Sequence, residues 1–192
     1  MYELIGRQEE SDIFLSLLKT DSAEMLAVVG RRRVGKTFLI QTVYKNDICF
    51  NLTGSQKSPL KEQLQNFAYQ METWSKSKVA VAPPKSWSEA FKQLSKFIDS
   101  KKFRQKKVIF LDELPWLASH KSGFLAALGY FWNNWASQKN IIVVICGSAA
   151  SWMIDKVINN KGGLHNRVTK LVVLQPFTLS ETKQYLQSRK IS

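Results

Sequence analysis

The chain has 192 residues, of which 44% are hydrophobic and 22% are charged. This length and composition predict a single compact α/β unit with a substantial core. No apolar run of about 18 residues occurs, and the amino terminus lacks the basic and then apolar layout of a secretory signal. We therefore expect a soluble, cytoplasmic protein without a membrane partner.

The formal net charge of +13 favours an acidic partner such as a nucleotide or a nucleic acid. The lysines are spread widely along the chain, and a solvated basic face is the commoner meaning of such a spread. Those lysines include Lys57, Lys61, Lys76, Lys78, Lys92, Lys96, Lys101, Lys102, Lys106 and Lys107. Direct binding of nucleic acid by this segment therefore stays open.

Cysteine and histidine usage argues against a disulfide or a zinc site. Cys49 and Cys146 each lie in a short apolar run, where a buried free thiol is the common case. His120 and His165 are the only histidines, and neither has the close spacing to cysteine that zinc sites use.

Helical and strand patterns alternate along the first half of the chain. The spacing of apolar residues predicts a helix over 9–19, a strand over 25–29, a helix over 36–44 and a strand over 48–52. Ser58 as a cap and Pro59 at the first helical position then predict a helix that carries its apolar face from Leu60 to Trp74.

The second half continues the alternation. A capping box, Ser86-x-x-Glu89, opens another helix, and a second box, Thr178-x-x-Glu181, opens a final helix that reaches about Arg189. Between them the pattern predicts a strand over 108–111, a helix with an aromatic stripe over 124–135, and strands over 141–146 and 171–174. Strands that alternate with helices predict a mainly parallel five-stranded sheet covered on both faces, which is a three-layer αβα sandwich.

A phosphate-binding motif lies between the first strand and the second helix. Its residues, Gly30-Arg31-Arg32-Arg33-Val34-Gly35-Lys36-Thr37, match G-x-x-x-x-G-K-[ST] in full, and Phe38 follows them. We expect all of these residues, Phe38 included, to contact the nucleotide. The glycines let backbone N–H groups surround a phosphate, and the helix amino terminus adds a favourable dipole. Lys36 is expected to neutralise the β and γ phosphates, and the Thr37 hydroxyl is expected to ligate Mg2+.

Two acidic residues follow the third strand. Asp112 and Glu113 lie where ligands of open α/β sheets bind, at the carboxyl end of a strand. We expect Asp112 to hold the metal with Thr37, and Glu113 to polarise the water that attacks the γ phosphate. Such a pair is a weak signal by itself and a strong one in combination with the phosphate loop.

Two further residues are candidates with an alternative interpretation each. Ser148, after the fourth strand, is a candidate for sensing the γ phosphate or positioning the water, and a plain helix cap is the alternative. Arg167, before the last strand, is a candidate for completing the charge clamp on the transferred phosphoryl group, in cis or from a neighbouring subunit. A surface arginine without a role is the alternative.

Several segments together resemble the AAA+-type ATPases of prokaryotes, in the branch of archaeal-type and STAND-related predicted ATPases. They are Leu4-Ile5-Gly6-Arg7-x-x-Glu10, GRRRVGKT, FLDELPW, CGSAASW, GGLHNR and PFTLSE. The resemblance implies ATP as the nucleotide, with Ile5, Gly6 and Arg7 beside the adenine. It also implies that residues 1–175 form the ATPase core and that residues 176–192 begin a truncated helical lid.

We therefore expect an ATP hydrolase of a molecular-switch type, in which nucleotide state reorders loops over residues 114–122 and 149–160. The alternative is a nucleotide-dependent DNA-binding or scaffolding module with negligible turnover. ATP or ADP with Mg2+ are the expected ligands, and assembly into a homo-oligomer is left open.

Overall fold

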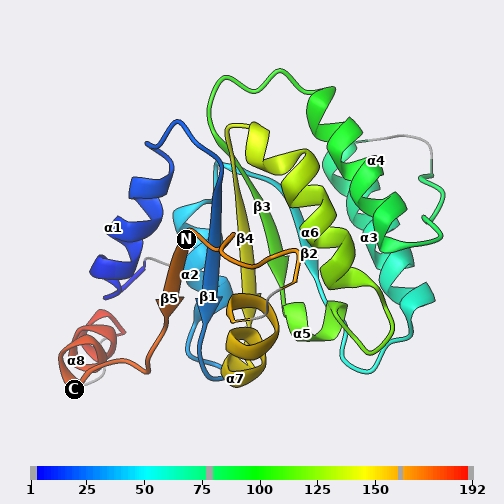
Figure 1. Ribbon diagram of the computed structural model, residues 1–192. Coiled ribbons are helices and arrows are strands. Elements are labelled where there is room, and N and C mark those ends of the chain that lie inside the picture. Colours follow the sequence, from blue (N-terminus) through cyan, green and yellow to red (C-terminus); the bar gives the residue numbers. More distant parts are fainter. Residues whose placement is uncertain (1–3, 77–79, 160–161, 190–192) are drawn as a thin grey trace.

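The computed structural model describes residues 4–76, 80–159 and 162–189, so that Lys78 and residue 160 of the second expected switch loop lie outside the described residues. Five parallel strands form one sheet in the order β2-β3-β4-β1-β5 (Figure 1). They are β1 (Glu24–Val29), β2 (Ile48–Thr53), β3 (Lys107–Asp112), β4 (Ile141–Gly147) and β5 (Lys170–Val173). Each predicted strand is present, with ends within one residue of those predicted, so the α/β class and the parallel sheet are confirmed.

Helices cover both faces of the sheet (Figure 1). On one face, α3 (Leu60–Ser75), α4 (Trp87–Asp99) and α6 (Phe124–Asn134) contribute the aromatic part of the core, and on the other face lie α1 (Gln8–Leu17) and α2 (Lys36–Val43). The side chains of β1 alternate between these two clusters, as the pleat of a strand requires. The three-layer arrangement is therefore as predicted.

The aromatic stripe of α6 belongs to the core. Phe131 stacks on Phe91 of α4 with ring centroids 4.8 Å apart, and Phe124 meets Trp87 edge to face at 4.8 Å. These rings are nearly fully buried. The aromatic stripe therefore holds α4 and α6 together.

Two helix starts differ from the prediction. Ser58 does not cap α3, because Pro59 is itself the extended cap residue and its carbonyl accepts the first helical hydrogen bond, from the Gln63 N–H at 3.2 Å. At α4 the Ser86 hydroxyl accepts from the Glu89 N–H as predicted, but the Glu89 carboxylate accepts from the Lys85 N–H instead of closing the box on Ser86. The box at Thr178 is complete and opens α8 (Leu179–Ser188).

Four short helical turns lie in the connections between the longer elements that the structure describes. They are α5 (Leu114–Leu117), the 3-10 turn η1 (Ala136–Gln138), α7 (Ala150–Met153) and the π-helical turn η2 (Ile154–Ile158). The sequence did not predict them, since segments of three to five residues are too short to show a period.

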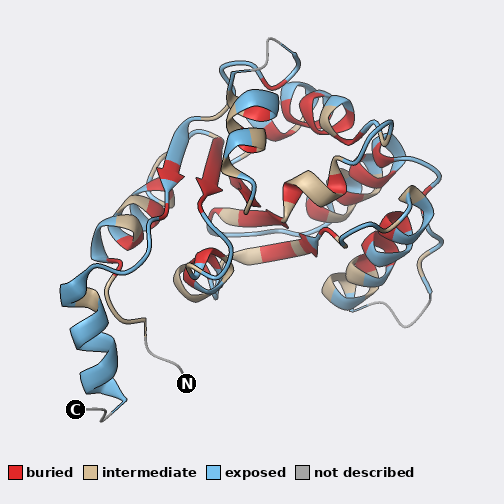
Figure 2. Cartoon of the chain, turned by 90° about the horizontal axis from the view of Figure 1, so that it is seen from below, coloured by how far each residue is buried: buried red, intermediate tan, exposed pale blue. Residues whose placement is uncertain are grey.

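Helix α8 differs from the other helices in its burial. It lies beside the carboxyl end of β5, and no residue of it is buried in the part of the chain that the structure describes (Figure 2). Leu179 is 92% exposed. No helix among residues 4–76, 80–159 and 162–189 is long and apolar enough to cross a membrane.

Candidate active site at the carboxyl edge of the sheet

The phosphate loop joins β1 to α2 at the centre of the carboxyl edge. Gly35 caps α2 with φ 92°, a left-handed conformation that glycine adopts without strain. The first turn of α2 contains no acidic residue. Its amino terminus is therefore an anion-binding position of the kind that a phosphate occupies.

Lys36 lies inside this loop. Its Nζ donates to the Gly30 carbonyl at 2.9 Å and to the Arg31 carbonyl at 2.8 Å, and the residue is only 5% exposed. A buried ammonium group needs such partners, because burial without them is costly. The loop thus holds a positive charge where the phosphates are expected.

Thr37 and Asp112 meet beside the loop. The Thr37 hydroxyl donates to Asp112 Oδ2 at 2.7 Å, and Asp112 Oδ1 accepts from the Glu113 N–H at 2.9 Å. Asp112 is 4% exposed, so these contacts fix its carboxylate. The neighbouring thiol of Cys146 stays neutral, because burial raises its pKa and the adjacent Asp112 raises it further.

Glu113 and Ser148 are in direct contact. Glu113 has φ 47°, and its Oε2 accepts from the Ser148 hydroxyl at 2.9 Å and from the Ser148 N–H at 3.3 Å. Helix α7 begins at Ala150 and its cap residue is Ala149. The structure therefore places Ser148 against the carboxylate and not at the cap of α7.

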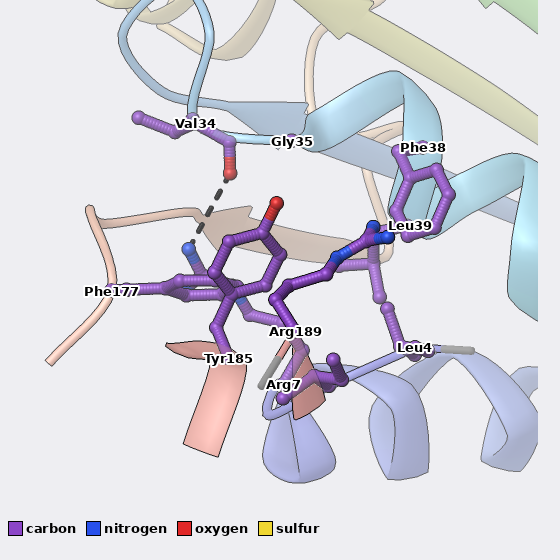
Figure 3. Close-up of a pocket in the computed structure, with 10 residues that line it drawn as sticks. Leu4, Arg7, Val34, Gly35, Phe38, Leu39, Phe177, Tyr185 and Arg189 are labelled. Atoms are coloured by element: carbon purple, nitrogen blue, oxygen red, sulfur yellow. Dashed lines mark hydrogen bonds between the residues drawn. The ribbon is translucent and has the colours of Figure 1, made fainter. Parts of the chain in front are cut away.

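A pocket of about 240 Å³ adjoins the phosphate loop (Figure 3). Its walls are mostly apolar and come from four parts of the chain: the amino-terminal segment, the phosphate loop, α2, and α8 with the residues that flank it. The lining residues are Leu4, Ile5, Arg7, Val34, Gly35, Phe38, Leu39, Phe177, Tyr185 and Arg189. Ile5, Arg7, Val34, Gly35 and Phe38 were predicted as nucleotide contacts, and the structure brings them together.

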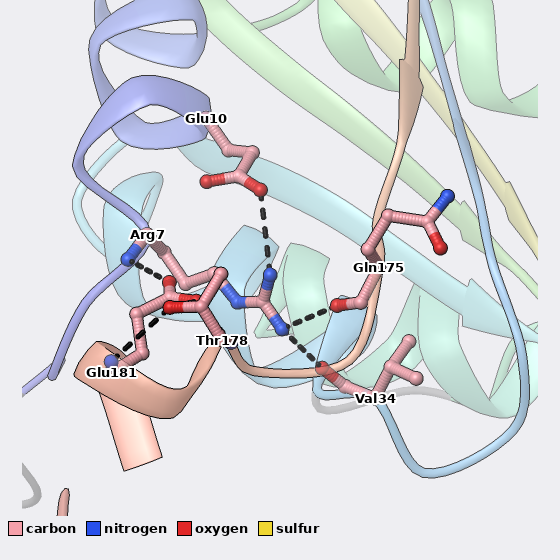
Figure 4. Close-up of polar contacts among 6 residues, drawn as sticks. All are labelled: Arg7, Glu10, Val34, Gln175, Thr178 and Glu181. Carbon is pink, nitrogen blue, oxygen red and sulfur yellow. Dashed lines mark hydrogen bonds and ion pairs between the residues drawn. The ribbon is translucent and has the colours of Figure 1, made fainter. Parts of the chain in front are cut away.

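Arg7 ties that pocket to the last helix (Figure 4). Its Nη2 donates to the Gln175 carbonyl at 2.6 Å and to the Val34 carbonyl at 3.4 Å. Its guanidinium carbon lies 4.6 Å from the ring centroid of Phe177, and its Nη1 pairs with Glu10 at 3.4 Å. Arg7 is 6% exposed, so one buried cation joins the start of α1, the phosphate loop and the segment that leads from β5 to α8.

Glu181 completes this network from α8. Its Oε1 accepts from the Arg7 N–H at 3.1 Å, and its Oε2 accepts from the Thr178 N–H at 2.8 Å. Burial by itself would raise the pKa of Glu181, but these hydrogen bonds, with the Thr178 hydroxyl and the Arg7 charge, outweigh it and lower the pKa. Gly6 is outside the pocket and packs here, where a Cβ would lie 2.8 Å from Glu181 Oε1.

The other arginines predicted as site residues do not line this pocket. Arg31, Arg32 and Arg33 are exposed on the phosphate loop, and the Arg32 guanidinium carbon lies 5.4 Å from the centroid of the Trp116 ring. Arg167 is exposed in the turn before β5. Because all strands are parallel, this turn lies at the amino edge of the sheet, away from the phosphate loop.

Sequence reasoning missed the contribution of α8 to the pocket. Phe177, Tyr185 and Arg189 line it, although they follow the phosphate loop by more than a hundred residues. The capping box at Thr178 predicted the helix, and two aromatic residues close to that box were a signal. Nothing in their spacing, however, indicated which surface they face.

Comparisons with known proteins agree with this geometry. Residues 4–189 match a family described as an ATPase domain predominantly from Archaea. An uncharacterised protein of Methanocaldococcus jannaschii, MJECL04, is 24% identical over 181 residues, which are 94% of this chain and 38% of that protein. The chain thus spans less than half the length of this curated relative.

Solved structures share the fold. The Walker-type ATPase PABY2304 of Pyrococcus abyssi superposes with a TM-score of 0.69 at 17% identity, over 98% of this chain and 60% of that one. The ORC2 protein of Aeropyrum pernix, solved with ADPNP and ADP, gives 0.63 at 17%, over 97% and 52%. Drosophila ORC bound to DNA gives 0.63 at 16%, over 97% and 46%. With a phosphate loop and an acidic pair at one edge of a parallel sheet, and a family match over nearly its whole length, the chain belongs to the ATPase domains found predominantly in Archaea.

Proposed function

We propose that this domain binds ATP together with Mg2+ and hydrolyses the bond between the β and γ phosphates. The observation that carries the proposal is the contact of Thr37 with Asp112 at 2.7 Å, which brings a hydroxyl and a carboxylate to one point beside the phosphate loop. Both are hard oxygen donors, so this pair fits Mg2+. When bound there, the ion would neutralise charge on the β and γ phosphates.

The chain's own groups supply the other steps. Lys36 exchanges the Gly30 and Arg31 carbonyls for phosphate oxygens, because a full negative charge makes the stronger hydrogen bond. A water oxygen bonds to the γ phosphorus while the bond to the bridging oxygen breaks, and that bond's electron pair stays on ADP. Glu113 orients the water and accepts its proton.

Ser148 sets the position of Glu113 before this step. Its hydroxyl and N–H both contact the carboxylate, which holds the carboxylate near the end of β4. A γ phosphate that competes for the Ser148 hydroxyl would release the carboxylate towards the water. Ser148 is therefore assigned to sensing the phosphate through Glu113.

The pocket beside the loop is assigned to the adenosine part of ATP. Its mostly apolar walls include Phe38, Phe177 and Tyr185, which suit a flat base, and it adjoins the phosphate loop at Gly35. The choice of adenine over guanine rests on the resemblance to AAA+-type ATPases. Competition by GTP against bound ATP tests that choice.

Helix α8 is assigned to the start of a lid, with residues 1–175 as the core. Tyr185 of this helix and Arg189, which follows it, line the pocket, whereas no described residue of the helix is buried. A nucleotide bound in the pocket would therefore change the position of α8. This link, together with movement of the loops over 114–122 and 149–160, is the proposed switch. Arg167, at the far edge of the sheet, would reach a phosphate only in a neighbouring subunit of a homo-oligomer.

The test is Mg2+-dependent ATP binding and steady-state hydrolysis by the chain and three variants. Lys36→Ala is expected to lose binding, whereas Glu113→Gln is expected to keep binding and to lower turnover by about 10²- to 10⁴-fold. Glu62→Gln, an exposed carboxylate on α3, is the matched control and should change neither. Turnover that survives in Glu113→Gln would refute the mechanism and favour the nucleotide-dependent binding or scaffolding module.

A further inference from the structure

Basic side chains from two separate segments of the sequence lie together at the amino edge of the sheet. Because the five strands are parallel, the segments that enter them meet at this edge, opposite the candidate active site. The loop from α4 to β3 crosses it with the sequence Ser-Lys-Lys-Phe-Arg-Gln-Lys over residues 100–106, which contains no acidic residue. Residues 101–105 of this loop are exposed.

This loop borders a hollow of about 230 Å³, on a surface far from the pocket assigned to adenosine. Lys101, Phe103 and Arg104 line it from the loop, and Lys107 lines it from the start of β3. Asp99 at the end of α4 and Lys139 in the segment before β4 complete this part of the lining. Four of these six side chains are cationic, and the one carboxylate among them, Asp99, pairs with Lys139. The hollow is therefore suited to a ligand that carries several negative charges.

Some of the cations around the hollow already form ion pairs or hydrogen bonds within the protein. Lys139 pairs with Asp99 at 2.8 Å, and Lys107 pairs with Asp47 at 3.7 Å. Lys106 is buried and donates to Thr20 and Ser22, which fixes the base of the loop.

The other three cations of the loop are not used in this way. Among the described residues, no carboxylate forms an ion pair with Lys101, Lys102 or Arg104. Their charge is available to a partner.

The loop also presents an aromatic ring. Phe103 is 39% exposed, and the Lys107 Nζ lies 5.9 Å from its ring centroid. An exposed ring among cations is the combination that single-stranded nucleic acid uses, since bases stack on the ring while phosphates pair with the cations. An acidic peptide would use the charges and have no need of the ring.

We propose that this hollow and the loop beside it bind single-stranded nucleic acid. Phosphates would pair with Lys101 and Arg104 of the hollow and with Lys102, which is exposed on the adjoining loop, and one base would stack on Phe103. A duplex keeps its bases stacked inside and offers none to the ring. The site is at the opposite edge of the sheet from the phosphate loop, so the proposal is independent of ATP hydrolysis and goes beyond it.

The test is fluorescence anisotropy of a labelled oligothymidylate at several salt concentrations. The triple variant Lys101→Glu, Lys102→Glu, Arg104→Glu should lose at least tenfold in affinity at about 0.1 M salt, and the slope of log affinity against log salt should become shallower by about two. Phe103→Ala should weaken binding by about tenfold while leaving the slope unchanged, because a stacked base carries no charge.

A second triple variant, Lys61→Glu, Lys85→Glu, Lys92→Glu, makes the same change in net charge at exposed positions on α3, just before α4 and on α4, none of which lines the hollow. It should bind the oligonucleotide like the unmodified chain. Equal losses of affinity in both triple variants would mean that overall charge explains the effect, and would overturn the site.

An unmodified chain that does not bind the oligonucleotide would also overturn the proposal. So would a polyglutamate peptide that binds as tightly, with no effect of Phe103→Ala. ATP binding and thermal unfolding of the first triple should match the unmodified chain, and if that triple fails to fold, Phe103→Ala and the salt slope decide.

Discussion

Replacing Arg7 with alanine should detach α8 while leaving the core folded. The change removes a charged hydrogen bond of 2.6 Å to the Gln175 carbonyl and the contact of the guanidinium with Phe177. A hydrogen bond to a charged group contributes about 1.5–3 kcal/mol, and a desolvated cation–π contact adds about 1–2 kcal/mol. Together we expect a loss of about 2.5–5 kcal/mol from the contacts that hold α8, which has no buried residue of its own among those described.

The assay has two readouts. Amide hydrogen exchange over Leu179–Ser188 should speed up by at least tenfold, and the Kd for a non-hydrolysable ATP analogue should rise by about tenfold, equivalent to about 1.4 kcal/mol. The affinity falls because Tyr185 of α8 and Arg189, the residue that follows this helix, line the pocket. Arg7→Lys should recover only part of both, since an ammonium group lacks the planar guanidinium, whose Nη2 donates to two carbonyls while its Nη1 pairs with Glu10.

Glu10→Gln is the matched control. Glu10 is three residues after Arg7, and its carboxylate oxygen lies 3.4 Å from Arg7 Nη1. An ion pair of this kind contributes less than about 1 kcal/mol to stability. Arg7→Ala with weaker nucleotide binding but unchanged exchange over α8 would mean that Arg7 acts on the nucleotide directly, and it would refute the tether.

Three more predictions concern the candidate metal site and the attachment of α8. Thr37→Val should abolish Mg2+-dependent hydrolysis while Thr37→Ser retains it, because only the hydroxyl at 2.7 Å from Asp112 matters; hydrolysis that persists in the valine variant would remove Thr37 from the metal site. Gly6→Ala should speed exchange over α8 and cost about 1–2 kcal/mol, since Gly6 has φ 66° and a Cβ would meet Glu181, and thermal unfolding of the variant measures the cost. The pKa of Glu181 is lowered in the folded state, so its contribution is fully present above its ordinary value of 4.5 and is lost as the pH falls through the lower folded value; exchange over α8 should follow this titration, and Glu181→Gln should remove it.

The sequence by itself determined the elements and the phosphate loop. Apolar runs and helical spacing are properties of neighbouring residues, so the strands and long helices could be predicted from them to within about two residues. The same holds for the loop from Gly30 to Thr37 and for the acids after β3, because each motif is continuous in the chain. The start of α3 was misjudged because Ser58 and Pro59 are compatible with two positions of the cap.

Only the tertiary structure decided which segments meet. The order of the strands places Ser148 against Glu113, and it places Arg167 at the edge away from the phosphate loop. The fold also brings Arg7 into contact with Gln175 and Glu181, which are more than 160 residues away in the sequence. It places the basic loop between α4 and β3 beside Lys139, and together they line a hollow. These contacts depend on the order in which the connections place the parallel strands in the sheet. That order cannot be predicted from the residues next to each position in the sequence.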